Sequence, residues 1–341
     1  MRLNIINMSP EYSAIWKYGV NLKKALQENA TFSQDYEVHF IDLWKDNLVS
    51  HNSVVRALQL VKGIKLNLSK KDINLYTLPL MSKFMKLNPC KKNIMMVHDL
   101  YPLQVKDDLV LHYLCKHIYT HISKADLILT NSEYTSEEYE DYYGGKTKAI
   151  HLGIEDNIYF NLSNLNKNSK LTLISIGRDE PRKNLTFMIE VLNRLQLQGL
   201  PFCMNRVGTF SKEHKELIDR YMLQDKIQVL ENVNEKELLD LYSMSHFLLF
   251  PSLQEGFGLP PIEAMCCKCI PLTSKNGSLP EVVDIPELSS DLNAEVWASI
   301  IVYLWKVKGE RDRLSHLCKV KSIQYTWYNY SNKLIPLLRL K

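Results

Sequence analysis

Residues 246–265 have the sequence HFLLFPSLQEGFGLPPIEAM, and the fold is inferred outward from them. The run 246–250 is short and apolar, which is typical of a buried strand. Gly256 and Gly258 permit a tight turn and a close approach of the backbone to a ligand. The two prolines at 260–261 suit the start of a helix, where a missing N–H costs nothing. The stretch therefore predicts a strand, a glycine turn and a helix that opens at the second proline.

The same turn predicts an anion site between two carboxylates. We expect the N–H groups of residues 257–260 to point into solvent at the helix start, where they attract negative charge. Glu255 precedes the turn and Glu263 is expected in the first helical turn, so both can flank one pocket. A single glutamate there would usually only complement the helix dipole. Two glutamates eight residues apart around this turn favour a binding site.

Residues 251–265 resemble the Glu-x7-Glu region of retaining, sugar-nucleotide-dependent glycosyltransferases of the GT-B fold, the group called family 4. The resemblance implies an α/β protein with two Rossmann-like domains facing a central cleft. It also implies a last helix that crosses back to the first domain. In this family the residue matching Glu263 accepts hydrogen bonds from the ribose, and the one matching Glu255 contacts the transferred sugar. The sugar and phosphate would lie against the backbone of Gly256, Phe257, Gly258 and Leu259.

A second motif, residues 177–184, follows a predicted strand and has the sequence GRDEPRKN. Arg178 and Lys183 can converge on a diphosphate through charge-assisted hydrogen bonds. The segment resembles the family's Gly-Arg…Lys-Asn motif, whose Arg and Lys hold the distal phosphate of the donor. The alternative is that these charged residues are simply solvated before a helix. The binding role is favoured because the motif lies in the same half of the chain as the two glutamates.

The length and the alternation of elements predict two domains. A chain of 341 residues is long for one domain, and strands alternate with helices, which favours a parallel sheet covered on both faces. We expect an N-terminal domain at 1–165, completed by a helix at about 325–341, and a nucleotide-sugar domain at 166–324. Residues 161–170, rich in Asn and Ser, are the predicted linker.

Loops at the carboxyl ends of the predicted strands supply the remaining candidates, because such loops form the binding crevice of open α/β sheets. Val233 lies in one of them and is a candidate donor contact. His98 follows the strand 93–97 and resembles the family's His-Asp segment, whose His approaches the donor sugar. A purely structural role at the strand end is the alternative for His98.

The sequence departs from the family pattern in one loop, and it lacks one metal-binding motif. Many family members have a glycine-rich loop on the acceptor side after the first strand, whereas here that loop is SAIWKYG at 13–19. No Asp-x-Asp triplet occurs, and we expect no metal and no cofactor. The donor would be a UDP-, GDP- or ADP-sugar, and Arg178, Lys183 and helix amides would stabilise the departing diphosphate.

The composition indicates which binding partners and which cellular compartment to expect. The formal charge of +4 is mild, so a nucleic-acid partner is not expected. The seven cysteines lack disulfide-like or zinc-ligand spacing, and no apolar run approaches a membrane span, so we expect a cytoplasmic protein without a signal peptide. Residues 56–92 hold nine basic residues and one acidic residue. This segment is either a peripheral contact to an anionic membrane or simply a solvated face.

The predicted function is a retaining, metal-independent glycosyltransferase acting on a glycan, lipid-linked or other acceptor. His98, Glu255, Lys183 and Arg178 are its expected catalytic residues. A same-fold sugar-nucleotide epimerase, a glycogen-synthase-like polymerase, a nucleotide-sugar-binding homologue without activity and a nucleic-acid-modifying transferase are the alternatives. An epimerase would turn over donor alone, without acceptor.

Overall fold

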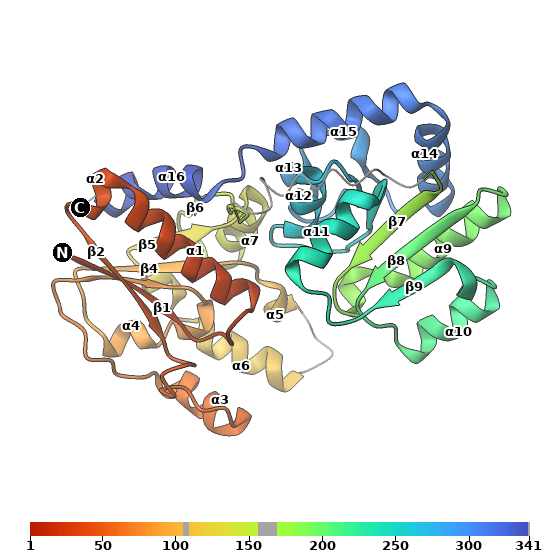
Figure 1. The fold of residues 1–341 in the computed structure, drawn as a ribbon. Helices are drawn as coiled ribbons and strands as arrows, with labels where there is room; N and C mark the ends of the chain where they lie inside the picture. The colour runs from red at the N-terminus through yellow and green to blue at the C-terminus, as the bar shows by residue number, and fades with distance from the viewer. Residues whose placement is uncertain (105–108, 156–168, 340–341) are drawn as a thin grey trace. The chain divides into compact units, whose positions relative to one another are not determined.

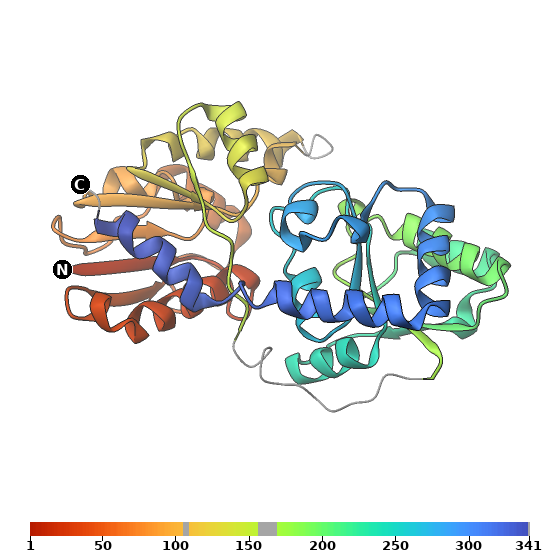
Figure 2. The ribbon, with the colours of Figure 1, turned by 90° about the horizontal axis from the view of Figure 1, so that it is seen from above.

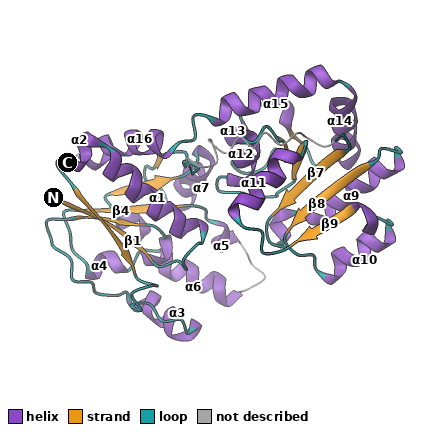
Figure 3. Cartoon of the chain, viewed as in Figure 1, coloured by secondary structure: helices purple, strands orange, loops and turns teal. Residues whose placement is uncertain are grey.

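The computed structural model describes residues 1–104, 109–155 and 169–339. Its strands form two sheets of six strands each, and every named strand pair within them is parallel. Figure 3 shows helices on both sides of each sheet. This is the covered parallel sheet that the alternation of strands and helices predicts.

The chain divides into two compact units. The first comprises residues 1–153 together with 327–341, and the second comprises residues 154–326. The C-terminal helix therefore belongs with the N-terminal sheet, as the family resemblance implies. The predicted domain boundary at 165/166, and most of the predicted linker, lie outside the described residues.

The first unit is built on a sheet with the order β2-β1-β3-β4-β5-β6. Its strands are β1 (Arg2–Asn7), β2 (Glu37–Asp42), β3 (Ile73–Tyr76), β4 (Lys92–Val97), β5 (Leu127–Thr130) and β6 (Lys148–Ala149). Its helices are α1 (Ala14–Glu28), α2 (Ala30–Ser33), α3 (Ser53–Lys62), α4 (Phe84–Leu87), α5 (Tyr101–Gln104), α6 (Leu109–Tyr119), α7 (Glu133–Tyr143) and α16 (Trp327–Arg339). Figures 1 and 2 show α16 lying along α1, where the hydroxyls of Tyr18 and Tyr330 are 2.8 Å apart.

The second unit is built on a sheet with the order β12-β11-β10-β7-β8-β9. Its strands are β7 (Leu171–Ile176), β8 (Phe202–Val207), β9 (Ile227–Leu230), β10 (Phe247–Phe250), β11 (Ile270–Ser274) and β12 (Ser289–Ser290). Its helices are α9 (Leu185–Leu197), α10 (Lys212–Arg220), α11 (Glu235–Met244), α12 (Leu259–Cys266), α13 (Leu279–Val283), α14 (Ala294–Lys306) and α15 (Lys308–Ser322). From β7 the sheet continues through β8 to β9 on one side, and from β10 it continues through β11 to β12 on the other side. The order in which successive strands are added therefore reverses between β7 and β10.

Local chemistry explains why the elements form where they do. All four residues of β10 are buried, as expected for a central strand of a covered sheet. Helix α7 begins after Ser132, whose hydroxyl accepts a hydrogen bond from the backbone N–H of Thr135 at 3.0 Å. In the second unit, the rings of Phe187 and Trp297 meet edge to face at 5.2 Å and join α9 to α14 in the core.

The bounds of some elements depend on local backbone geometry, and one predicted helix start is wrong. Strand β6 has only two residues. Helix α10 ends at Arg220, because Met222 has a left-handed φ of 52°. Helix α12 begins at Leu259, two residues before the predicted start. Helix α3 overlaps the start of the basic segment 56–92.

Two further predictions concern the cysteines and the membrane. All seven cysteines are free, as their spacing predicts. None of the helices in the described part of the chain is long and apolar enough to cross a bilayer.

Candidate functional site

The two strongest sequence motifs meet at one point of the second sheet. Strands β7 and β10 pair side by side where the strand order reverses. The segment 177–183 follows the carboxyl end of β7, and Glu255 follows that of β10. In open α/β sheets, ligands bind outside the carboxyl ends of the strands at such a reversal. The topology therefore marks this edge as the candidate site.

A carboxylate with two cationic partners forms the centre of the site. Oε1 of Glu255 accepts a hydrogen bond from Nζ of Lys183 at 2.5 Å, and its Oε2 accepts one from Nη1 of Arg182 at 3.1 Å. The three side chains are 9%, 13% and 23% exposed in the order Glu255, Lys183 and Arg182. A buried ion pair is favourable only where the remaining hydrogen-bonding capacity is also met. We call these three residues the Glu255 cluster.

An aromatic ring supports the cluster from the strand. Nζ of Lys183 lies 5.0 Å from the centre of the Phe250 ring, so the ammonium group makes a cation–π contact. The backbone N–H of Leu253 donates to the carbonyl of Arg182 at 2.7 Å. These contacts fix the segment after β7 against the segment after β10.

The loop after β11 holds the backbone of the Glu255 turn. Gly277 has a φ of +62°, and a Cβ there would lie 2.7 Å from the carbonyl oxygen of Glu255. The Ser278 hydroxyl donates to the carbonyls of Glu255 and Phe257 at 3.1 and 2.8 Å. Only a residue without a side chain permits this approach, so Gly277 and Ser278 together set the position of the turn.

The helix start differs from the prediction in three ways. Gly258 has a φ of +95° and precedes Leu259, the first residue of α12. Because the helix begins there, Glu263 lies in the second turn and the first turn has no acidic residue. The prolines at 260–261 have no N–H, so residues 257–259 are the only donors this turn offers, which is narrower than the predicted 257–260.

Glu263 contacts a buried tyrosine. Its Oε2 accepts a hydrogen bond from the hydroxyl of Tyr242 at 3.1 Å. Burial and the neighbouring carboxylate raise the pKa of Tyr242 well above its usual value, so the hydroxyl stays protonated and donates at neutral pH. Glu263 is partly exposed, and a carboxylate has further acceptor capacity for a ligand.

Two predicted residues have few contacts. Arg178 is exposed, and within the described ranges of the chain its side chain has no hydrogen bond or ion pair. The structure therefore does not bring its side chain onto Lys183 or Glu255. Val233 is partly buried in the loop after β9, next to Asn232 with its φ of 55°.

The sequence analysis missed Arg182 and a carboxylate–imidazole contact beside the site. Arg182 adjoins Lys183 in the Pro-Arg-Lys turn, and that adjacency was the available signal. Oδ2 of Asp179 accepts hydrogen bonds from Nδ1 of His214 at 2.9 Å and from the N–H of Ser211 at 2.5 Å. Asp179 and His214 are 35 positions apart in the sequence, so no local pattern joins them.

His98 lies in the first unit, directly after β4. Its ring contacts that of Tyr18 edge to face at 5.1 Å. Burial lowers the pKa of His98 to about 4, so the imidazole is neutral at pH 7. Its Nε2 is buried without a hydrogen-bond partner among the residues described. A neutral imidazole offers one donor and one acceptor nitrogen.

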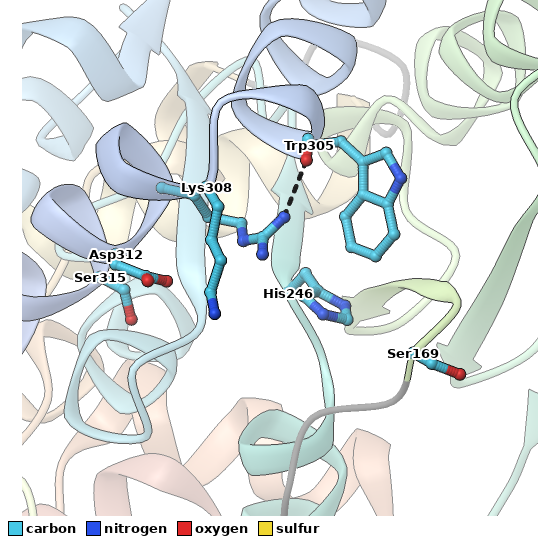
Figure 4. Close-up of a pocket in the computed structure, with 7 residues that line it drawn as sticks. Ser169, His246, Trp305, Lys308, Asp312 and Ser315 are labelled. Atoms are coloured by element: carbon cyan, nitrogen blue, oxygen red, sulfur yellow. Dashed lines mark hydrogen bonds between the residues drawn. The ribbon is translucent and has the colours of Figure 1, made fainter.

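A separate pocket lies at the opposite edge of the second sheet. It has a volume of about 620 Å³ and includes Ser169, which precedes β7, and His246, which precedes β10. Figure 4 shows Lys308 and Trp305 lining it. Arg311 also lines the pocket, and its guanidinium donates to the Trp305 carbonyl at 3.0 Å. Because parallel strands share one direction, this pocket is at their amino ends, away from the Glu255 cluster.

Over the described ranges, no three His, Cys, Asp or Glu side chains lie together as a metal site would require. Metal independence remains a prediction about the reaction.

The comparisons with known structures decide the fold. The chain superposes on sucrose-phosphate synthase from Thermosynechococcus elongatus with a TM-score of 0.74 and 19% identity, covering 99% of this chain and 98% of that one. It superposes on Anabaena HepE in complex with UDP and glucose with a TM-score of 0.71 and 15% identity, covering 99% of both chains. The fold is GT-B.

Sequence comparisons concern mainly the second half of this GT-B chain. Residues 157–314 match the family of glycosyl transferases group 1. The chain is 22% identical over 301 residues to the O-antigen chain mannosyltransferase RfbU of Salmonella typhimurium strain LT2, covering 78% of this chain and 79% of that protein. The chain spans between 14% and 45% of the length of the first curated relatives it matches. The family match includes the whole Glu255 cluster.

Proposed function

We propose that this protein is a glycosyltransferase that moves a hexose-type sugar from a nucleotide diphosphate donor to a glycan or lipid-linked acceptor with retention. The observation that carries the proposal is the Glu255 cluster at the strand reversal, inside the segment that matches group 1 glycosyl transferases. In the proposed arrangement, the Glu255 carboxylate would bind sugar hydroxyls and the adjoining Lys183 would bind phosphate. The complex of HepE with UDP and glucose gives a precedent of the same fold.

Different residues of the site would bind three parts of the donor: the diphosphate, the transferred sugar and the ribose. Lys183 and the exposed Arg178 would hold the distal phosphate, together with the backbone amides of residues 257–259. Glu255 would accept hydrogen bonds from the transferred sugar. Glu263 would accept them from the ribose, because a carboxylate can take two adjacent hydroxyl donors. The base would then lie toward the loop of Val233.

The leaving diphosphate would gain its stabilisation from protein cations. Negative charge on the diphosphate grows as the glycosidic bond breaks, and preorganised positive groups are most effective when they oppose such developing charge. Lys183 is already fixed by Glu255 and Phe250 and needs little reorganisation. No metal and no cofactor are required in this scheme.

Retention would follow from departure and attack on one face of the sugar. Glu255 is a poor candidate for a covalent nucleophile, because both of its oxygens accept hydrogen bonds from cations. Its role is then in binding and in holding Lys183. His98, neutral at pH 7, would accept a hydrogen bond from a sugar hydroxyl at its unpaired Nε2.

The basic segment 56–92 would support a lipid-linked acceptor. Six of its lysines are exposed: Lys62, Lys65, Lys70, Lys71, Lys86 and Lys91. Each basic residue near an anionic bilayer contributes about 1 kcal/mol to binding. Sedimentation at low salt with anionic and with neutral vesicles tests this contact, and equal pelleting with both would remove it.

A donor screen tests the function itself. UDP-, GDP- and ADP-sugars are added singly in a thermal-shift assay, and one base class is expected to raise the Tm. The selected donor is then incubated with and without acceptors, and release of nucleoside diphosphate is measured. Release that depends on acceptor supports a transferase, and conversion of the donor alone would identify an epimerase. Donor binding without any turnover would identify a binding homologue, and no shift with any donor would overturn the proposal.

A further inference from the structure

Beneath the candidate phosphate site lies a buried arginine that the proposed roles do not use. Arg206 is in β8, next to β7, and its side chain is fully buried. Arginine is almost never fully buried unless it is paired. Here the guanidinium hydrogen-bonds to two backbone carbonyls and one hydroxyl, and its Nε has no partner in the described part of the chain.

The strongest of these bonds fixes the turn after β7. Nη2 of Arg206 donates to the carbonyl of Gly177 at 2.6 Å, and weaker contacts at 3.4 Å reach the carbonyl of Thr209 and the hydroxyl of Ser175. Gly177 itself has a φ of +130°, a conformation that L side chains rarely adopt. The guanidinium thus holds the one peptide group that turns the chain toward Arg178.

The surrounding backbone is built around this contact. A Cβ on Gly208 would lie 2.3 Å from the Gly177 carbonyl oxygen and 3.2 Å from Nη2 of Arg206. A Cβ on Gly177 would lie 3.5 Å from Cε of Lys183, so the Lys183 stem packs directly on this glycine. Arg206 therefore contacts Gly177, and Gly177 in turn supports Lys183.

The charge of this arginine is only partly compensated. Burial lowers the pKa of Arg206 to about 10, and Asp179 opposes that shift, so the side chain remains a cation at neutral pH. A buried cation is costly unless a negative group lies near it. A phosphate bound over the Gly177 turn would supply that negative charge.

We propose that Arg206 is a positioning residue for the diphosphate of the donor: it fixes Gly177, and so Lys183 and Arg178, and it favours a ligand with two phosphates over one with a single phosphate. This inference rests on the proposed function, because it assigns the diphosphate to the same edge of the sheet. It adds a residue that no local motif contains.

The test compares diphosphate with monophosphate binding. Arg206→Met removes the charge and the hydrogen bonds but keeps a long side chain, and Arg206→Lys keeps only the charge. Arg220→Met, at an exposed position of α10, is the matched control for loss of one arginine. Dissociation constants are measured for UDP, GDP and ADP and for the corresponding monophosphates.

For the base that binds wild-type protein, we expect Arg206→Met to weaken the diphosphate roughly tenfold or more, since hydrogen bonds involving charged groups have this size. Binding of the monophosphate should change little. Arg206→Lys should fall between wild type and Arg206→Met, and the control should match wild type. A lower Tm with an unchanged ratio of the two constants would mean that Arg206 only fills the core, and would overturn the proposal.

A second measurement separates this inference from the proposed function. If wild-type protein binds none of the three diphosphates, the donor class is wrong. Hydrogen exchange of the peptide at 177–184 then still tests the positioning, and faster exchange confined to that segment in Arg206→Lys or Arg206→Met is expected. Unchanged exchange there would overturn the proposal. If Arg206→Met does not fold, Arg206→Lys carries both measurements.

Discussion

The candidate residues at the carboxyl edges of the two sheets differ in charge, although both sheets have six parallel strands. At the second edge, Lys183 and Arg182 meet the carboxylate of Glu255 where the strand order reverses between β7 and β10. At the first edge the order reverses between β1 and β3, and the neutral imidazole of His98 follows the neighbouring strand β4. His98 contacts Tyr18, whose hydroxyl pairs with that of Tyr330.

This difference indicates which chemical groups each unit suits. Fixed charges in the second unit suit a diphosphate, whereas a neutral imidazole in the first suits uncharged hydroxyls. Burial maintains that neutrality, because it lowers the pKa of His98 to about 4 and raises the pKa of Tyr330 beyond its usual value. Variants that alter charge at one edge should therefore fail in a different way from variants at the other.

The largest effect is expected at Lys183. Lys183→Ala removes a cation that opposes charge developing on the leaving diphosphate, so kcat should fall by roughly 100- to 1000-fold. Glu255→Gln should resemble it, because Glu255 holds the Lys183 ammonium and is proposed to bind the reacting sugar. Donor-titrated initial rates give the result.

Lys212→Ala is the control for these two variants, since Lys212 is an exposed residue of α10 with one surface ion pair to Glu216. Circular dichroism checks that each variant folds. Full kcat in a folded Lys183→Ala protein would place the phosphate site elsewhere.

The next effect concerns Glu263 and separates binding from chemistry. Glu263→Gln keeps the shape but weakens charge-assisted hydrogen bonds to the ribose, which are worth about 1.5–3 kcal/mol. Donor KM should rise roughly ten- to a hundredfold, with kcat less affected if the contact is equal in ground and transition states. Tyr242→Phe keeps the carboxylate but removes its 3.1 Å partner and should raise KM less. An unchanged KM in Glu263→Gln would refute the ribose assignment.

The sequence predicted those parts of the site whose chemistry is local. The Glu255 turn needs two glycines and a helix start within ten residues, and β10 is the buried strand that the apolar run at 246–250 predicts. The pairing of Glu255 with Arg182 spans 73 positions and depends on which strands become neighbours. No periodicity encodes that choice.

The contacts of buried polar residues were harder still to predict from the sequence. Arg206 occupies a strand position that resembles any other interior position, and only the fold shows that Gly177 faces its guanidinium. Glu263 was misplaced by one turn because Gly258, in a left-handed conformation, starts the helix before the prolines. In both cases the deciding information is tertiary contact rather than local propensity.

At the first edge, the prediction is a pH dependence of stability. His98 has a pKa of about 4 in the folded protein, against about 6.5 in an unfolded chain. Between these values the unfolded state binds more protons, so the free energy of unfolding falls as pH falls from about 6.5 towards 4. Wild type should lose about 2 kcal/mol more than His98→Gln between pH 7 and 4.5.

Urea unfolding at each pH, followed by circular dichroism, measures this difference. Other titrating groups are common to both proteins and cancel in the comparison. Parallel curves for wild type and His98→Gln would show that His98 is not held neutral by burial.

The smallest effect is expected from chelation, and it tests whether the charged edge is sufficient on its own. The scheme assigns the neutralisation of the diphosphate to Lys183, Arg178 and the amides of residues 257–259, so excess EDTA should leave the initial rate unchanged within error. Initial rates are measured before and after dialysis against EDTA and after addition of Mn²⁺ or Mg²⁺. Loss of activity that either ion restores would mean that a hard cation with oxygen ligands shares the task. The second edge would then be incomplete without it, and the loss caused by Lys183→Ala should shrink when the ion is present.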